Sequence, residues 1–183
     1  HPFNTGELVL GAQGSFFARV VDTNPKMMVD AMFEAAKHDG TSVVEILQNC
    51  VIFNDKAHKS ITSKDLRDEF QLVLRNGEPM IFGKDNKKGI RLNGTRLEVV
   101  TIGENGITEN DILVHDQYQK DPGIHLMLAK MQPPYMPIAL GVIRSAMYPT
   151  YDDLVVDQID ESRKVSNIKC VDDLLNSGDT FYI

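Results

Sequence analysis

Apolar and polar positions alternate with two different periods in the first third of the chain, and these periods predict a strand, a helix and a second strand. Residues 15–21 and 43–47 are apolar runs typical of strands, and turn residues around the second run predict a strand buried on both faces. Between them, Asn24 can cap a helix that begins at Pro25 and ends near Gly40. The apolar face of this helix is expected in the core and consists of Met27, Met28, Ala31, Met32, Ala35 and Ala36. Such an order predicts a right-handed βαβ unit with parallel strands.

The rest of the chain is more mixed. Helices are predicted over residues 6–13, 64–74, 123–131, 151–162 and 170–176. Strands are predicted over residues 79–82, 89–92, 97–102, 110–115 and 138–143, with residues 177–183 extended. Short strands separated by Gly and Asn turns indicate an antiparallel meander after residue 77. We therefore expect an α/β fold in which residues 1–55 hold part of a parallel sheet and residues 56–183 form a mixed α+β extension.

Composition limits the possible partners. The 183 residues are 42% hydrophobic, which is enough for one substantial core. A net charge of −7 disfavours nucleic acid as a partner, because phosphate binding needs a basic face. No apolar run is long enough to cross a membrane, so we expect neither nucleic-acid nor membrane binding. Two cysteines about 120 residues apart, without a signal peptide, favour a reducing cytoplasm over a disulfide framework.

Cys50 is the residue most suited to chemistry. It follows the second predicted strand, and ligands of parallel sheets gather beyond the carboxyl ends of such strands. A cofactor ligand, a nucleophile and a buried structural cysteine all remain open for it, while Cys170 reads as structural. His115-Asp116 is a weak pair, and the other histidines are scattered: His1, His38, His58 and His125. Without a CxxC, phosphate-binding loop or HExxH motif, the sequence contains no complete active site.

Several short motifs follow one another along almost the whole chain. They are His1-Pro-Phe-Asn-Thr-Gly6, Phe17-Ala-Arg19, Val44-Glu-Ile-Leu-Gln-Asn-Cys-Val-Ile-Phe-Asn-Asp55, Phe82-Gly-Lys84, Lys88-Gly-Ile-Arg-Leu92, Pro133-Pro134, Gly141-Val-Ile143, Pro149-Thr-Tyr151 and Leu175-Asn-Ser-Gly-Asp-Thr180. In this order they resemble the β subunit of 2-oxoacid:ferredoxin oxidoreductases, above all the two-subunit 2-oxoglutarate type. The resemblance is to the carboxyl-terminal part of that subunit.

The resemblance implies a cofactor set and a reaction. The β subunit binds thiamine diphosphate, Mg²⁺ and one [4Fe–4S] cluster, and the match implies that Cys50 is the fourth cluster ligand. Residues 1–55 would be the last βαβ part of the thiamine-diphosphate-binding domain, and residues 56–183 the carboxyl-terminal extension of the subunit. The reaction is oxidative decarboxylation of a 2-oxoacid to an acyl-CoA, with electrons passed through the cluster to ferredoxin. The implied partners are the α subunit, ferredoxin, the 2-oxoacid and coenzyme A.

The remaining motifs of that family are expected upstream of His1, where the sequence starts without an initiator Met. We therefore expect this fragment alone to be inactive and free of cluster, thiamine diphosphate and Mg²⁺, and we assign no catalytic residue in it. Two other functions stay open. One is a non-catalytic α/β module that docks another protein, with Cys50 in its core, and the other is a thiamine-diphosphate enzyme without a cluster.

Overall fold

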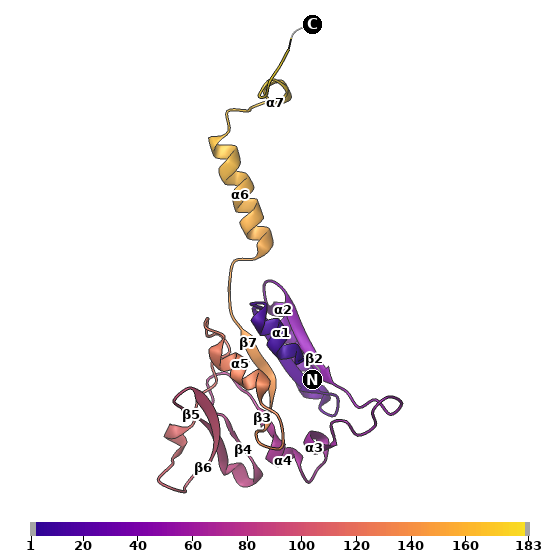
Figure 1. Ribbon diagram of the computed structural model, residues 1–183, viewed down its shortest axis with the longest axis vertical. Helices are drawn as coiled ribbons and strands as arrows, with labels where there is room; N and C mark the ends of the chain where they lie inside the picture. The colour runs from indigo at the N-terminus through magenta and orange to yellow at the C-terminus, as the bar shows by residue number, and fades with distance from the viewer. Residues whose placement is uncertain (1–2, 182–183) are drawn as a thin grey trace. The chain divides into compact units, whose positions relative to one another are not determined.

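A computed structural model describes residues 3–181, in two compact units that divide between Tyr148 and Pro149 (Figure 1). The helices of the first unit are α1 Thr5–Gly11, α2 Pro25–Lys37, α3 Lys59–Thr62, α4 Arg67–Phe70 and α5 Gly123–Lys130, with 3₁₀ turns η1 Lys84–Asn86 and η2 Glu109–Asp111. Its strands are β1 Phe16–Val21, β2 Ser42–Leu47, β3 Gln71–Val73, β4 Ile81–Phe82, β5 Lys88–Asn93, β6 Arg96–Thr101 and β7 Ile138–Ser145. The second unit holds α6 Tyr151–Val165 and α7 Val171–Leu175.

The predicted βαβ unit is confirmed. β1 and β2 are parallel, with Phe16 opposite Ser42 and Val21 opposite Leu47. α2 connects them and begins where the sequence predicts, because the Asn24 side chain accepts a hydrogen bond of 3.1 Å from the backbone N–H of Met27. Right-handed crossover connections are the rule for such units, so these two strands define the parallel part of the sheet.

Four strands form the main sheet, in the order β2-β1-β7-β3. β7 runs antiparallel to β1, and β3 runs parallel to β7. α2 packs on one face of β1, while α1 and α5 pack on the other, so every residue of β1 is buried. The sheet therefore combines strands from both sides of residue 55, and the proposed division at that residue stays a prediction.

A second sheet, β4-β5-β6, is antiparallel and confirms the predicted meander. Figure 1 shows β5 and β6 on the side of the first unit away from β2, with β4 next to β3. Side chains of the meander and of the main sheet share one hydrophobic core, which includes Leu72, Ile90 and Leu128. The meander is thus packed onto the main sheet within one compact unit.

The predicted burial of β2 and α2 is only partly correct. β2 is only half-buried, because it lies at one edge of the sheet that residues 3–181 form. On α2, Ala31 is buried and Met27, Met28 and Ala35 are partly buried, but Met32 and Ala36 face solvent. The apolar face of α2 is therefore wider than the part of it that residues 3–181 bury.

Two predicted elements are wrong. Residues 64–74 are not one helix, because Gln71–Val73 pair with β7 and Leu72 is fully buried there. Tertiary pairing thus overrides the local helical pattern. Residues 110–115 contain the end of η2 and a single bridge from Val114 to Pro79 in place of a strand. The predicted helices α5, α6 and α7 and the strand β7 are confirmed, whereas residues 182–183 of the expected extended tail lie outside the described residues.

Arg19 is a buried cation in the middle of β1, with only 3% of its surface exposed. Its Nε donates to the carboxylate of Glu45 at 2.5 Å, directly opposite on β2. Its Nη1 donates to the carbonyl oxygen of Ala129 in α5, and its Nη2 donates to Oδ1 of Asn4, which also caps α1. The guanidinium therefore joins β1 to β2, α1 and α5.

We expect Glu45→Ala to lower the free energy of unfolding by about 3 kcal/mol, because it leaves a buried guanidinium without its counter-ion. Asp30→Ala, which breaks the exposed ion pair with Lys26, is the matched control and should cost less than about 1 kcal/mol. Urea unfolding followed by circular dichroism measures both. Equal losses for the two variants would contradict this role of Arg19.

Candidate metal centre

Cys50 lies three residues beyond the end of β2, in a loop of residues 49–56 that we call the Cys50 loop. Its carbonyl oxygen accepts a hydrogen bond of 3.0 Å from the backbone N–H of Asn54, which closes the loop around residues 51–53. The sequence thus places the cysteine correctly beyond a parallel strand, although a short connection separates it from that strand.

Asn49 fixes the two ends of the Cys50 loop. Its backbone N–H donates to the carboxylate of Asp22 at 3.0 Å, just after β1. Its side-chain Nδ2 donates to Asp55 at 3.1 Å, and its Oδ1 accepts from the backbone N–H of Lys56 at 2.7 Å. The Asn49 side chain therefore holds the start of the loop against its end, and Asp22 holds both at the carboxyl edge of β1.

The Cys50 loop stabilises a thiolate. Hydrogen bonding by the backbone N–H groups of Phe53, Ile52 and Asn54 lowers the pKa of the Cys50 thiol, while burial opposes this shift. Hydrogen bonds to the charged form are a general cause of a lowered pKa. A thiolate is also the form that binds metals. Cys50 is therefore better suited to ligate a metal than a buried structural cysteine would be.

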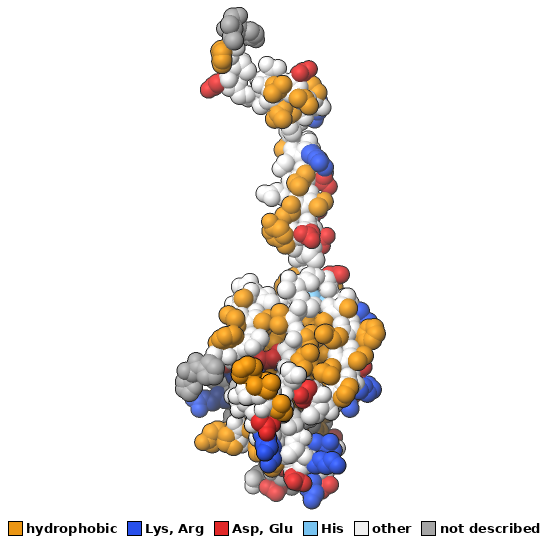
Figure 2. Space-filling view, turned by 90° about the vertical axis from the view of Figure 1, so that its right-hand side faces the viewer, with side chains coloured by type: hydrophobic (Ala, Val, Ile, Leu, Met, Phe, Trp, Pro, Cys, Tyr) orange, Lys and Arg blue, Asp and Glu red, His pale blue; other side chains and the backbone are white. Residues whose placement is uncertain are grey.

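The tip of the Cys50 loop is apolar and exposed. Ile52 and Phe53 have 83% and 91% of their surface exposed. Other exposed apolar side chains lie on α2 and β2, namely Val29, Met32, Phe33 and Ile46. Figure 2 shows hydrophobic side chains gathered on one face of the molecule. Apolar surface of this kind is typical of a contact with further protein.

Cys50 is a single potential ligand. Within residues 3–181, no group of three or more His, Cys, Asp or Glu side chains is arranged to hold a metal ion. Cys170, the other free cysteine, is exposed at the start of α7 in the second unit. A metal centre at Cys50 would therefore take its remaining ligands from other protein.

A pocket of about 300 Å³ lies at the carboxyl ends of β1 and β2. Leu47 and His58, on either side of the Cys50 loop, border it together with Arg19 and Glu45. The carboxyl ends of parallel strands are where such sheets bind ligands. Because Arg19 and Glu45 neutralise each other, the pocket has no unpaired charge from this pair to attract an anion.

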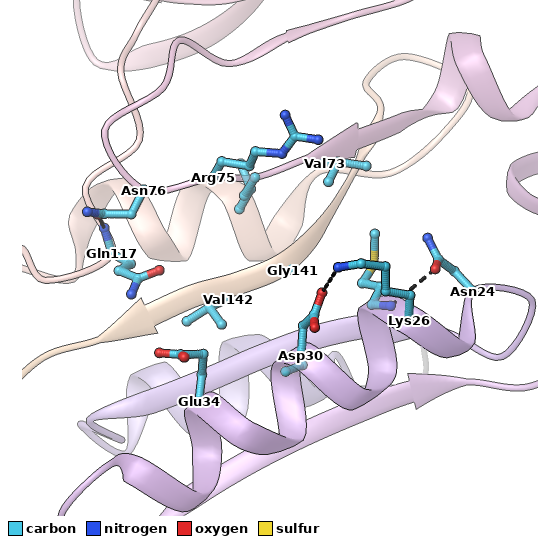
Figure 3. A pocket seen from close by; sticks show the side chains of 13 residues that line it. Asn24, Lys26, Asp30, Glu34, Val73, Arg75, Asn76, Gln117, Gly141 and Val142 are labelled. Atoms are coloured by element: carbon cyan, nitrogen blue, oxygen red, sulfur yellow. Dashed lines mark hydrogen bonds and ion pairs between the residues drawn. The ribbon is translucent and has the colours of Figure 1, made fainter.

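Figure 3 shows a second cleft of about 370 Å³, between α2 and the segment after β3. Asp30 and Glu34 come from α2, Arg75 lies on the opposite wall, and the backbone of Gly141 contributes to the floor. The polar groups are partly paired within the chain, Lys26 with Asp30 and Arg75 with Glu78. No cysteine or histidine lines this cleft, so it is not a candidate for the metal centre.

The structure brings together two histidines that the sequence leaves scattered. The buried rings of His115 and His125 meet edge to face, with centroids 6.3 Å apart. Burial lowers the pKa of both, so both rings are neutral at pH 7. Their Nε2 atoms hydrogen-bond to the backbone oxygens of Val142 and Asp116, respectively, at 2.9 Å. Because carbonyl oxygens can only accept, each Nε2 carries the ring proton and donates it in these hydrogen bonds.

Arg144 completes this buried cluster. It donates to Nδ1 of His125 at 3.0 Å and to the backbone oxygens of Gln119 and Lys120 at 2.8 Å. All of these contacts hold the segment before α5 against β7, so the cluster is structural. Periodicity could not reveal it, because His115, His125 and Arg144 lie in a loop, a helix and a strand. His38 contacts Ser15 and Phe16 instead, and His1 lies outside the described residues.

In sequence, this chain is similar to subunits of 2-oxoglutarate oxidoreductases that are named KorB. It is 33% identical over 186 residues to "2-oxoglutarate oxidoreductase subunit KorB" of Mycobacterium tuberculosis, covering 100% of this chain and 49% of that subunit. It is 35% identical over 65 residues to "2-oxoglutarate synthase subunit KorB" of Archaeoglobus fulgidus, covering 36% of this chain and 22% of that subunit. The family resemblance noted in the sequence is confirmed. No protein-family model matches the chain.

The chain spans about half the length of the relative that it matches throughout. Its fold is similar to that of a 2-oxoglutarate:ferredoxin oxidoreductase from Magnetococcus marinus, whose structure has 2-oxoglutarate, coenzyme A and succinyl-CoA bound. The TM-score is 0.59 at 17% identity, over 98% of this chain and 46% of that one. This likeness confirms the predicted α/β class. No helix among residues 3–181 is both long and apolar enough to cross a membrane.

We expect the alkylation of Cys50 by iodoacetamide to reach half its maximal rate at a lower pH in the folded chain than in urea. The reason is that unfolding ends the backbone hydrogen bonding that lowers the pKa of the thiol. The rate is measured against pH in a Cys170→Ser background. Asn49→Ala, which releases the loop, should move the folded profile toward the unfolded one. Identical profiles with and without urea would contradict the proposed stabilisation.

Proposed function

We propose that this chain is the carboxyl-terminal part of the β subunit of a 2-oxoglutarate:ferredoxin oxidoreductase. The observation that carries this proposal is the 33% identity to a KorB subunit over the full length of the chain. The reaction would be oxidative decarboxylation of 2-oxoglutarate to an acyl-CoA, with electrons leaving through a [4Fe–4S] cluster to ferredoxin. A docking module without catalytic function is less well supported, because the named relatives are oxidoreductase or synthase subunits.

Cys50 is the residue of this chain that would hold the cluster. Cluster ligands are thiolates, and backbone hydrogen bonds to sulfur are one of the means by which a protein tunes the cluster. In the Cys50 loop, backbone N–H groups lower the pKa of the Cys50 thiol, which favours the thiolate. The other three cysteines would come from the remainder of the subunit, as the family resemblance implies.

Thiamine diphosphate and Mg²⁺ would also be held mainly by the remainder of the subunit. Mg²⁺ needs oxygen ligands in a strict octahedral arrangement, and the diphosphate needs a cradle of backbone amides. Among the described residues, no three His, Cys, Asp or Glu side chains are arranged to hold a metal ion. The cofactor supplies the carbanion chemistry when bound, and the role of this chain is to place Cys50 and to exclude water around it.

The edge of β2 and the apolar tip of the Cys50 loop suit this role. β2 ends the sheet within residues 3–181, so its outer backbone groups are open to a further strand. Exposed Ile52 and Phe53 lie two and three residues after the ligand. A strand added at β2, together with protein over the tip, would complete the sheet and shield the cluster from solvent.

The partners would be the α subunit, ferredoxin, the 2-oxoacid and coenzyme A. The bound 2-oxoglutarate, coenzyme A and succinyl-CoA of the Magnetococcus marinus enzyme support the choice of substrates. The two free cysteines support a reducing cytoplasm as the location. A thiamine-diphosphate enzyme without a cluster would share the sheet but would need no thiolate at position 50.

In the complete enzyme, Cys50→Ser should abolish the visible absorbance of the iron–sulfur cluster and electron transfer to ferredoxin, since a hydroxyl is a poor ligand for the cluster. Iron content per subunit and ferredoxin reduction are the measurements. Cys170→Ser is the matched control and should leave both unchanged. Iron content at the level of the unsubstituted enzyme in Cys50→Ser would exclude the ligand role and favour a cluster-free enzyme or a structural cysteine.

The 183-residue chain alone should bind neither thiamine diphosphate nor Mg²⁺, contain no stoichiometric iron and self-associate through its open sheet edge. Titration calorimetry with the cofactor and metal, iron analysis and light scattering check these expectations. The complete subunit serves as the positive control. Micromolar cofactor binding by the short chain would show that the site lies within it.

A further inference from the structure

The cleft between α2 and the segment after β3 contains a polar side chain that is nearly buried and has no partner. Gln117 lines this cleft and has only 8% of its surface exposed. Its backbone is fixed, because its N–H donates to Oδ1 of Asn76 at 3.1 Å and its carbonyl oxygen accepts from the N–H of Ser145 at 2.7 Å. Its side-chain amide forms no hydrogen bond with any residue between 3 and 181. A molecule in the cleft can supply the donor and the acceptor that this amide lacks.

The floor of this cleft is backbone, at a point where β7 is irregular. The pairing of β7 with β1 shifts register between Phe17 and Ala18, beside Val142. The neighbouring Gly141 has a φ of +105°, and a Cβ atom there would lie 3.1 Å from the carbonyl oxygen of Leu74. Bulges and interior glycines of this kind let two segments of backbone approach closely, and bulges are frequent next to functional sites. Gly141 therefore leaves the floor free of a side chain.

Charges of both signs line the walls of the cleft. Asp30 and Glu34 lie one turn apart on α2, and Arg75 lies on the opposite wall (Figure 3). Each of the three has an exposed ion-pair partner three or four residues away, respectively Lys26, Lys37 and Glu78. Exposed ion pairs contribute little free energy, so a ligand can replace them at small cost. The lining therefore suits a ligand that carries both charges better than one with a net charge.

We propose that this cleft binds a free α-amino acid whose side chain ends in a carboxamide. The ammonium group of the amino acid pairs with Asp30 and Glu34, and its carboxylate pairs with Arg75. Its carboxamide donates to and accepts from the amide of Gln117, which thereby gains both partners. A volume of about 370 Å³ is at the small end of ligand sites and suits a molecule of this size. The inference does not depend on the proposed function, because every group that it uses belongs to the first unit.

The test is titration calorimetry of the complete subunit with L-glutamine and with L-methionine, which has a similar length but no amide. L-glutamine should bind at least about tenfold more tightly, because L-methionine leaves the Gln117 amide without a partner. Gln117→Met should remove this preference. Glu34→Gln should weaken both ligands by the same factor, about threefold, because both carry the ammonium group. Gln119→Met and Glu104→Gln are the matched controls: both residues are exposed and lie outside the lining, so neither affinity should change.

Several outcomes overturn the inference. Absence of L-glutamine binding by the unsubstituted subunit would do so directly, and equal affinities for the two ligands would show that the Gln117 amide is not used. A preference for L-glutamine that persists in Gln117→Met would place the site elsewhere. Tighter binding of L-glutamate or L-lysine would show that the cleft selects a net charge. If Gln117→Met shows no cooperative thermal transition, the comparison of ligands and the Glu34→Gln variant decide without it.

Discussion

The burial of β1 is the constraint on which the first unit depends. A central strand with all six residues buried must satisfy every polar group inside the protein, and one of its side chains is a guanidinium. The Arg19 charge is balanced by Glu45 only because β1 and β2 run parallel in the register that sets these residues opposite each other. The other donors of the guanidinium reach Asn4 and Ala129, so α1 and α5 have to lie over the same face. One buried charge thus links the pairing of the strands to the packing of the helices.

The same strand pair positions the Cys50 loop. Asp22 follows β1 and binds the backbone N–H of Asn49, so the loop after β2 is held at the carboxyl edge of its neighbour. Backbone N–H groups of the loop lower the pKa of the Cys50 thiol, and the apolar tip of the loop is exposed. Under the proposed function, Cys50 would supply one ligand of the cluster. The other ligands and the shielding from solvent would come from protein that packs against β2.

Arg144 resembles Arg19 in burial but differs in how its charge is accommodated. Arg19 has a carboxylate partner, whereas Arg144 is surrounded by carbonyl oxygens, the neutral His125 and the Tyr148 hydroxyl. Burial keeps His115 and His125 neutral, which avoids further positive charge beside the guanidinium. Both arginines fasten a loop or helix to the sheet, but only Arg19 borders the pocket beside the Cys50 loop.

The sequence by itself determined the local elements: the Asn24 cap of α2, the parallel βαβ unit, the meander and the Thr150 cap of α6 all follow from short-range patterns and steric rules. It also placed Cys50 beyond a parallel strand and carried the family resemblance. Only the tertiary structure decided that residues 71–73 form a strand beside β7, that β2 is an edge, and that His115, His125 and Arg144 meet. The reason is physical. Helix caps depend on residues a few positions apart and crossovers on the fixed handedness of the chain. Strand partners, burial and the contacts among His115, His125 and Arg144 depend on which distant segments the fold brings together.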